Sequence, residues 1–220
     1  MQIEGTTKHE SSLVYEDAEV EAYTVATFAK VERQKLADID GLSADMLLTL
    51  RQGVMTQVEV LLIGSPAASA TPGVGILNTD GIVTPDVSGL NLDRAVGRLK
   101  ATLAAQGTVA NFVAAHPLTI EAEESRVGED GQSVKTIDDQ GRIRRLPLIA
   151  TVALAEGDVL VGDSRIGARL GVREAITAAI GQEQDDMTKN RVTTLVEGRW
   201  APLVGVPDAF AYGTLDAPED

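Results

Sequence analysis

The stretch Met187 to Trp200, MTKNRVTTLVEGRW, holds the residues whose types and spacing come nearest to chemistry in this chain. Asn190 offers an amide, and Glu197 offers a carboxylate that could act as a general acid or base. The stretch otherwise has the pattern of a β-strand, in which seven residues span about 23 Å. An odd separation places two side chains on opposite faces of a strand. Asn190 and Glu197 therefore cannot share one site within one subunit.

A structural role for this pair is the simpler interpretation. Asn190 would start the strand, and Glu197 would form an ion pair near Arg199. Nucleophilic catalysis needs a serine, cysteine, threonine or lysine beside a base, and the sequence contains neither a G-x-S-x-G nor an S-x-x-K motif. It also lacks the Walker loop that cradles phosphates. We therefore expect no catalytic residues and no enzyme.

Metal-ligand patterns are missing as well. The chain has no cysteine, and His9 and His116 lie more than a hundred residues apart. His116 precedes Pro117 and is expected at the end of a strand, and His9 is expected in solvent. Carboxylates crowd EAEES and GEDG without the D-x-D-x-D-G spacing of a calcium loop, so we interpret them as a solvated charged face. No metal and no cofactor are expected.

Charge restricts the class of partner. The 220 residues include 33 acidic and 19 basic side chains, a net charge of −14. Such a surface repels nucleic-acid backbones, which argues against a groove-reading protein but leaves open a container to which DNA does not adhere. The N-terminus lacks a signal-peptide pattern, and no run of about 18 apolar residues occurs, so neither secretion nor a membrane partner is expected.

The first half of the chain predicts an arm and a long helix. Residues 11–32 mix β-branched, aromatic and charged residues at near-alternate spacing, which favours an extended, partly solvated β-arm. Ser43 could cap the following helix and Gly64 could end it, while Gly53 could mark a bend or a close backbone crossing. The apolar stripe of this helix is Leu42, Met46, Leu50, Val54, Val58 and Leu61.

The remainder predicts a loop, a second helix and several strands. Gly73-Val74-Gly75 lacks the third glycine of a dinucleotide fingerprint, where Asn78 stands instead, so nucleotide binding is not expected. Strands cluster from Leu146 onward, after the helices, which argues for an α+β fold. The second helix carries an apolar stripe of Leu92, Val96, Leu99 and Leu103 and ends at Gly107.

The order of these parts resembles the major capsid proteins of tailed bacteriophages, the Hong Kong ninety-seven-like fold, over nearly the whole chain. Each matching segment is weak alone, and their shared order and spacing make the match specific. The segments are VERQKLAD, GVGILN, NFVAAHP, LVGDSRIGARLGVREAI and DDMTKNRVTTLVEGRWAPLVGVPDAFAYGT.

The resemblance implies an α+β capsid fold with a long spine helix at about 43–63, an extended β-arm, and axial and peripheral domains. An isolated two-stranded arm is marginal in water, so we expect the arm to contact neighbouring subunits more than its own chain. The implied division is 1–28 for the remnant of an extended loop, 29–74 and 188–202 for the peripheral domain, and 75–187 and 203–220 for the axial domain and C-terminal tail.

The resemblance also implies a structural role. Such proteins self-assemble as pentamers and hexamers into an icosahedral shell around double-stranded DNA. The expected location is the virion capsid, assembled in the host bacterial cytoplasm. The expected partners are other copies of this chain, with portal, scaffold or protease, and decoration proteins as further candidates. An acidic average suits a wall that packaged DNA contacts only non-specifically.

In some family members a lysine amine attacks an asparagine amide carbon on a second subunit, helped by a glutamate from a third, and an isopeptide bond results. The match places Asn190 and Glu197 at the asparagine and glutamate positions. The arm reads Val14-Tyr15-Glu16-Asp17-Ala18 where the lysine would lie, and the nearest upstream lysine is Lys8. Family members usually carry more chain before this point, so the outgoing strand of the loop would be absent. We expect the pair to mark the family without cross-linking.

Three alternatives remain open. An encapsulin-like compartment would share the fold and enclose a cargo enzyme instead of DNA. A small enzyme using carboxylates of the axial region would show a concave pocket with perturbed acids. A monomeric structural or binding domain would not assemble.

Overall fold

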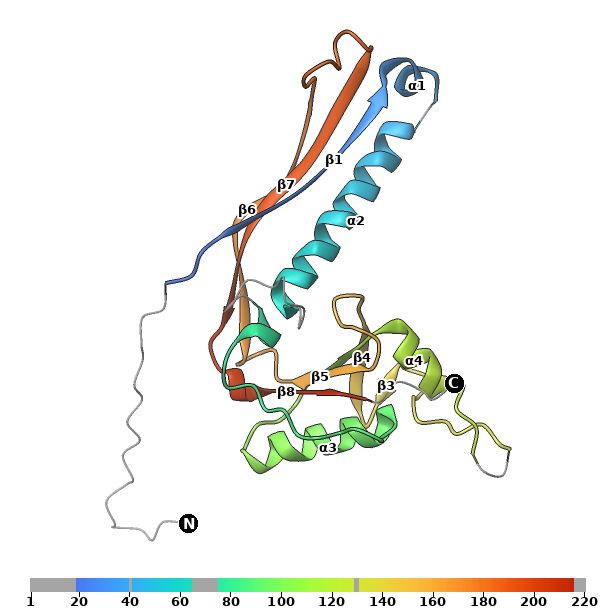
Figure 1. Cartoon of the computed structure of the whole chain (residues 1–220), viewed down its shortest axis with the longest axis vertical. Helices are drawn as coiled ribbons and strands as arrows, with labels where there is room; N and C mark the ends of the chain where they lie inside the picture. The colour runs from blue at the N-terminus through green and yellow to red at the C-terminus, as the bar shows by residue number, and fades with distance from the viewer. Residues whose placement is uncertain (1–18, 40, 65–74, 129–130, 216–220) are drawn as a thin grey trace, which may run out of the picture.

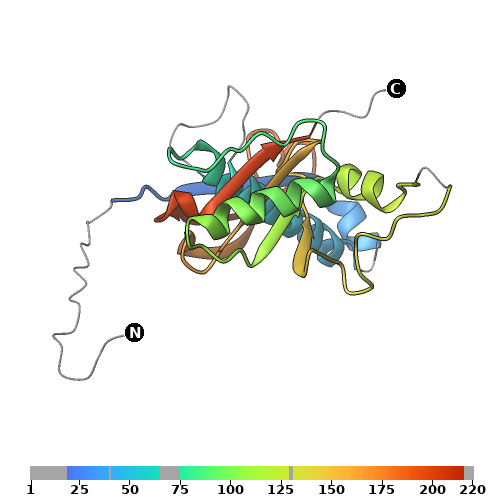
Figure 2. The ribbon, with the colours of Figure 1, turned by 90° about the horizontal axis from the view of Figure 1, so that it is seen from below.

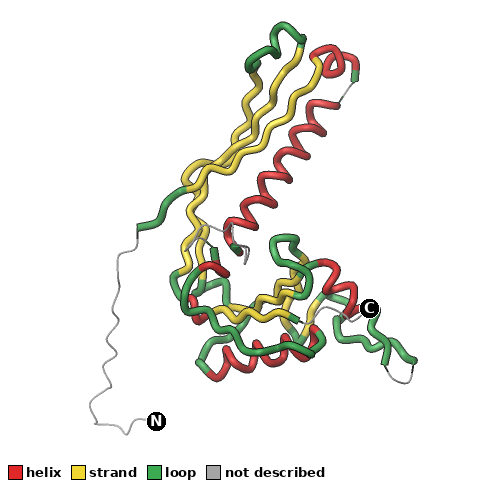
Figure 3. The backbone as a smooth tube through the Cα atoms, viewed as in Figure 1, coloured by secondary structure: helices red, strands yellow, loops and turns green. Residues whose placement is uncertain are grey.

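The molecule is elongated and has two lobes, each built on its own sheet (Figure 1). The computed structural model describes residues 19–39, 41–64, 75–128 and 131–215. Helices and strands are both well represented in it, as Figure 3 shows, and the expected α+β class is confirmed. The upper lobe contains β1 (Tyr23–Glu32), helix α1 (Arg33–Asp38), helix α2 (Leu42–Ile63), β6 (Ala168–Gly181) and β7 (Arg191–Val204).

Helix α2 is the predicted spine. It begins after Gly41, a glycine at φ 84°, and no side chain caps its start, so the predicted Ser43 cap was wrong. It ends at Gly64, as predicted, again at φ 84°. The helix continues unbroken through Gly53, where an added Cβ would lie 3.9 Å from Thr27 Cγ2 of β1, an ordinary contact.

The apolar stripe of α2 packs on the upper sheet. Leu50, Val54 and Val58 are buried, and Met46 and Leu61 pack around them, as the predicted stripe requires. Leu42, its first member, is half-buried and lies outside this core. By length and composition α2 is also apolar enough to cross a bilayer. Here, however, its stripe is part of the upper-lobe core, against Val25, Val196 and Trp200.

The upper sheet is antiparallel, with β7 between β1 and β6. Strand β1 pairs with β7 along its whole length, from Tyr23 opposite Trp200 to Glu32 opposite Arg191. Residues 23–28, expected in the arm, therefore lie in a sheet of their own subunit, and the arm residues before 19 lie outside the described ranges. Strand β6, which the expected division places in the axial part, also pairs with β7 in this lobe.

The lower lobe is built on a five-stranded sheet. Its order is β3 (Arg142–Ile143), β4 (Leu146–Ala150), β2 (Phe112–Ala115), β5 (Asp158–Gly162) and β8 (Phe210–Thr214). Strands β2 and β4 are parallel and the other neighbours are antiparallel. Every residue of β5 is buried, as expected for a central strand covered on both faces.

Two α-helices and two short 3-10 helices complete this lobe. Helix α3 (Leu92–Ala105) runs across the sheet when the molecule is seen from below (Figure 2), and its predicted stripe of Leu92, Val96, Leu99 and Leu103 is buried. The Asn91 side chain caps its start by accepting from the Arg94 N–H at 3.0 Å. The others are α4 (Pro117–Glu124), η1 (Ile76–Asn78) and η2 (Pro207–Ala209).

Candidate functional site

Strand β7 positions the residues that the sequence singled out. Alternate residues Thr194, Val196, Gly198 and Trp200 are buried, and Val196 and Trp200 belong to the core that α2 covers. A Cβ on Gly198 would lie 2.4 Å from Trp200 Cη2, so glycine is needed for the indole to pack there. Glu197 has the opposite parity and lies on the other face of the sheet, between Ala26 of β1 and Thr177 of β6.

Asn190 closes the loop that precedes β7. It is exposed and has φ 53°, a left-handed conformation that asparagine tolerates better than most residues. Its carbonyl oxygen accepts from the Arg33 N–H at 3.0 Å and so ties the loop to α1. Because β7 begins at Arg191, strand alternation does not extend to Asn190, and the expected opposite-face argument does not apply to it. Asn190 and Glu197 still lie about 20 Å apart along the strand, given a rise of 3.3 Å per residue.

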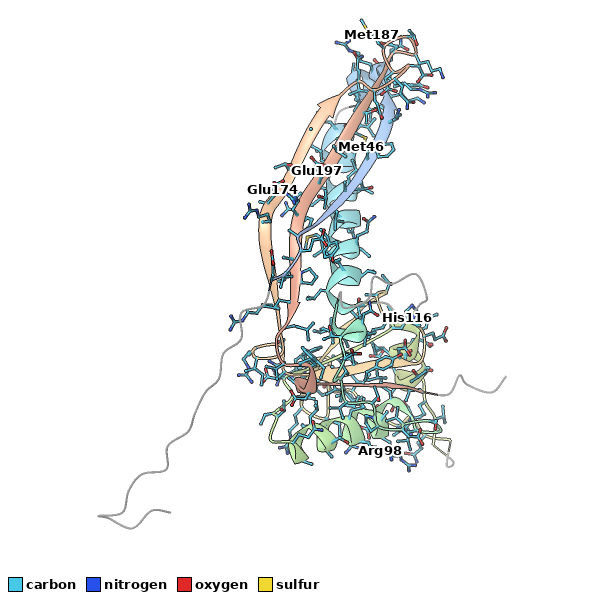
Figure 4. The ribbon with its side chains drawn as sticks, turned by 60° about the vertical axis from the view of Figure 1, so that its left-hand side comes forward. Met46, Arg98, His116, Glu174, Met187 and Glu197 are labelled. Carbon is cyan, nitrogen blue, oxygen red and sulfur yellow. The ribbon has the colours of Figure 1, made fainter. Side chains whose placement is uncertain are left out.

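The expected ion pair of Glu197 with Arg199 was wrong. Arg199 pairs instead with Glu174 of β6, at 3.5 Å between Nη1 and Oε1. Figure 4 shows Glu174 and Glu197 on neighbouring strands of the upper lobe. Among the described residues no cation lies within ion-pair distance of Glu197.

A buried carboxylate that the sequence reading missed organises the loop between β6 and β7. The Asp186 side chain is fully inaccessible and accepts from Thr193 Oγ1 at 2.6 Å and from the Glu183 N–H at 2.9 Å. Lys30 Nζ of β1 lies 3.6 Å from its other oxygen. The Thr193 hydroxyl, the Glu183 N–H and the Lys30 ammonium, in that order, hold the pKa of Asp186 below its ordinary value. The loop is thereby fastened to both β7 and β1.

Lys30 is the described lysine nearest to Asn190 on the paired strands. It lies opposite Thr193, four strand positions or about 13 Å from Glu197. Its amine is shared by the carboxylates of Glu183 and Asp186, at 3.5 and 3.6 Å. Lys8, the upstream lysine of the sequence, lies outside the described residues. Lys189, next to Asn190 in the sequence, pairs with Asp185. Among the described residues of one subunit, no lysine pairs with Glu197, and Asn190 and Glu197 are too far apart to share a lysine.

The other candidate residues have structural partners. The His116 ring caps α4, since Nδ1 accepts from the Leu118 N–H at 3.2 Å. Glu123, from the acidic EAEES run, is buried and binds Arg126 at 3.0 Å and Thr136 Oγ1 at 2.8 Å. Among the described residues no three histidine or acidic side chains gather as a metal site would require. These groups stabilise α4 and the loop after it.

Gly75 has a packing role. It has φ 85°, and an added Cβ would lie 2.6 Å from the Gly64 backbone nitrogen and 2.9 Å from the Leu61 carbonyl oxygen. Glycine is therefore required where the two ends of segment 65–74 meet. Gly73 and Val74 lie outside the described residues.

An apolar pocket of about 330 Å³ lies where the end of α2 meets the lower lobe. Ile63, Ile76, Phe112, Leu160 and Phe210 are among its lining residues, and Glu59 is its one acidic residue. Thr151 Oγ1 donates to the Glu59 carboxylate at 3.2 Å and so links the spine helix to the residue that follows β4. A single hydrogen-bonded carboxylate does not form the pair of carboxylates that acid–base hydrolysis uses, and the pocket is therefore better explained as a packing gap between the lobes.

No protein-family model matches the sequence, and a search of curated proteins finds no match. Solved structures match in fold. One from Gordonia phage Cozz has a TM-score of 0.70 and 17% identity, covering 96% of this chain and 79% of that chain. The capsid of a native GTA particle has a TM-score of 0.62 and 13% identity, covering 90% of this chain and 74% of that chain. A virus-like particle from Pyrococcus furiosus has a TM-score of 0.61 and 15% identity, covering 86% of this chain and 75% of that chain.

These neighbours include phage capsid structures, so the chain has the phage major capsid fold that its sequence resembles. At such low identity the likeness establishes the fold, and the function needs its own argument.

Proposed function

We propose that this chain, with its phage major capsid fold, is a structural capsid protein that self-assembles as pentamers and hexamers into an icosahedral shell around double-stranded DNA. The observation that carries the proposal is the match in fold to the capsid of a native GTA particle over 90% of the chain, beside the match to a structure from Gordonia phage Cozz over 96%. It favours a structural role over a carboxylate-based enzyme. We propose the virion capsid as its location, after assembly in the host bacterial cytoplasm.

Exposed apolar side chains on the spine helix and on β6 support self-association. On α2, Leu48 and Met55 are 65% and 44% exposed, and on β6, Val172 and Ile180 are 62% and 67% exposed. A groove between these elements is lined partly by Met55, Val172 and Trp200. Assembly into a shell would remove such exposed apolar side chains from water, which favours association.

The strand pairing supports a revised domain division. The peripheral domain would comprise β1, α2, β6 and β7, since these elements share one core. The axial domain would comprise the five-stranded sheet with α3 and α4, which share another. Residues 1–18 remain assigned to the extended loop.

The charge of the chain supports DNA as the content. At −14 per subunit, a closed shell would not adhere to packaged DNA, which keeps the content mobile. Portal, scaffold or protease, and decoration proteins are further proposed partners. The alternative is an encapsulin-like compartment that encloses protein cargo, and the likeness to a virus-like particle from Pyrococcus furiosus supports a shell of either kind.

The test is to express the chain and examine it by negative-stain electron microscopy and size-exclusion chromatography. Closed shells or capsomers are expected. Particles from the natural source should contain nuclease-protected DNA, whereas particles filled with a co-purifying enzyme would support the compartment. A chain that stays monomeric at all concentrations would refute the capsid role.

A further inference from the structure

The lower lobe carries a patch of positive charge on an otherwise acidic chain. We name it the basic face: Arg94, Arg98, Lys100, Arg142, Arg144 and Arg145. The segments that hold it, residues 91–107 and 140–147, contain six cations and one acid, a net charge of +5. The rest of the chain therefore carries −19. Figure 4 places Arg98 at the end of the molecule far from Met187 of the upper lobe.

The β3–β4 hairpin is fixed against α3 to form this face. Arg144 Nε donates to Asp93 Oδ1 at 2.7 Å, and its Nη2 binds the other Asp93 oxygen. Lys100 Nζ donates to the Arg144 carbonyl oxygen at 2.9 Å. These contacts join the two segments into one surface with little freedom to rearrange.

The turn of this hairpin has unusual residues. Arg144 and Arg145 link the strands and have φ of 51° and 69°. A two-residue turn of this kind favours Asn-Gly, because left-handed backbone is costly for residues with long side chains. Two arginines at such positions are not explained by the needs of the turn.

Most of the basic face forms no ion pair with the described residues of its own subunit. Arg94, Arg98, Arg142 and Arg145 are exposed, and none makes an ion pair with the described residues, although the chain has 33 acidic side chains. Of the six residues of the basic face, Arg144 alone makes an ion pair with the described residues, and its partner is Asp93. Exposed, unpaired guanidinium groups are suited to bidentate binding of carboxylates on another molecule.

A complementary surface lies on the same lobe. Residues 117–139 contain seven acids and two cations, a net charge of −5. Glu121 and Glu124 lie three residues apart on α4, so they share one helix face, and both are exposed without an ion pair to the described residues. We name this pair the acidic face.

We infer that the basic face of one copy binds the acidic face of α4 on a second copy. The inference rests on the proposed function, since it names the surfaces used in self-assembly. Copies with a net charge of −14 repel one another, so association is favoured where opposite charges meet. Because the two faces are different surfaces, the contact is heterologous and can close into rings. Nucleic acid is less favoured as the occupant, because the remaining −19 repels it.

The test reverses each face and then both. The variants are Arg142→Glu/Arg145→Glu, Glu121→Arg/Glu124→Arg, the combined quadruple, and Arg33→Glu/Lys35→Glu on α1 as a control of equal charge change. Self-association is measured by sedimentation equilibrium, and folding by circular dichroism. Each single-face reversal should weaken association at least about tenfold, and the quadruple should restore it. The control should lose much less association than the basic-face reversal, which carries the same change in net charge, and salt should weaken wild-type association.

The outcomes separate the inference from the proposed function. Shells from the wild type together with undiminished association of both reversals would overturn the inference alone. The wild type could form weak oligomers without shells, and each single-face reversal could abolish these oligomers while the quadruple variant restores them. This outcome would support the inference and count against the capsid role. A basic-face reversal that assembles normally but loses salt-sensitive DNA binding would assign the face to nucleic acid. A quadruple variant that folds and does not associate would also overturn the inference.

Discussion

The spine helix should stabilise the single subunit through one face only, and Val54→Ala tests this. Val54 is fully buried, where it packs with Val25, Leu50, Val196 and Trp200 in a small upper-lobe core. The substitution removes two methyl groups, each contributing about 0.8 kcal/mol of transfer free energy, and leaves a cavity. We expect the free energy of unfolding to fall by about 2 kcal/mol.

The assay is urea unfolding followed by Trp200 fluorescence, because the chain has one tryptophan and it lies in this core. The matched control is Met55→Ala, one residue along the same helix, where 44% of the residue is already exposed. We expect the control to cost under about 1 kcal/mol in dilute, unassembled protein. A Val54→Ala variant within about 0.5 kcal/mol of the wild type, or a control that costs as much, would refute this orientation of α2.

Three further predictions concern the loop, a tyrosine and the candidate pair. Asp186→Asn should lower the melting temperature more than Asp185→Asn does. Folding depresses the pKa of Asp186, so its carboxylate stabilises the fold at pH values above its ordinary pKa of 3.8, and this stabilisation is lost as pH falls through the lower folded pKa. The Asp186→Asn variant should lack this part of the pH dependence of stability. Burial raises the pKa of Tyr212 to about 12, so ultraviolet titration should show one late tyrosine that Tyr212→Phe removes, and stability should fall as pH rises from 10 towards 12. Denaturing electrophoresis of assembled particles should give a single monomer band, and a ladder of covalent oligomers abolished by Asn190→Ala or Glu197→Ala would show that cross-linking occurs.

Local sequence patterns predicted the helices well. The stripes of α2 and α3 follow helical period, and burying such a stripe is the simplest way to stabilise a helix. Gly64 ended α2 as expected, because glycine readily adopts φ 84°. Ser43 failed as a cap because the helix begins at Leu42, which places Ser43 inside the first turn.

Pairings between distant segments could not be predicted in the same way. Nothing in the sequence near Tyr23 indicates that β1 pairs with β7, more than 160 residues later. The same limit applies to Arg199, which binds Glu174 across the sheet although Glu197 is closer in sequence. In the sequence Asp186 is one of 33 acidic residues, and only the fold brings Thr193 and Lys30 to it.

Charge and apolar burial contribute differently to the assembly that we propose. The basic and acidic faces of the lower lobe act over about 10 Å at moderate salt, so they would set the orientation and rate of the first encounter. The exposed side chains of α2 and β6, including Met55 and Val172, would then contribute most of the affinity as they leave water. Salt should therefore slow assembly more than it dissociates finished particles. Met55→Asp, by contrast, should make finished particles dissociate more readily at every salt concentration and leave the monomer folded.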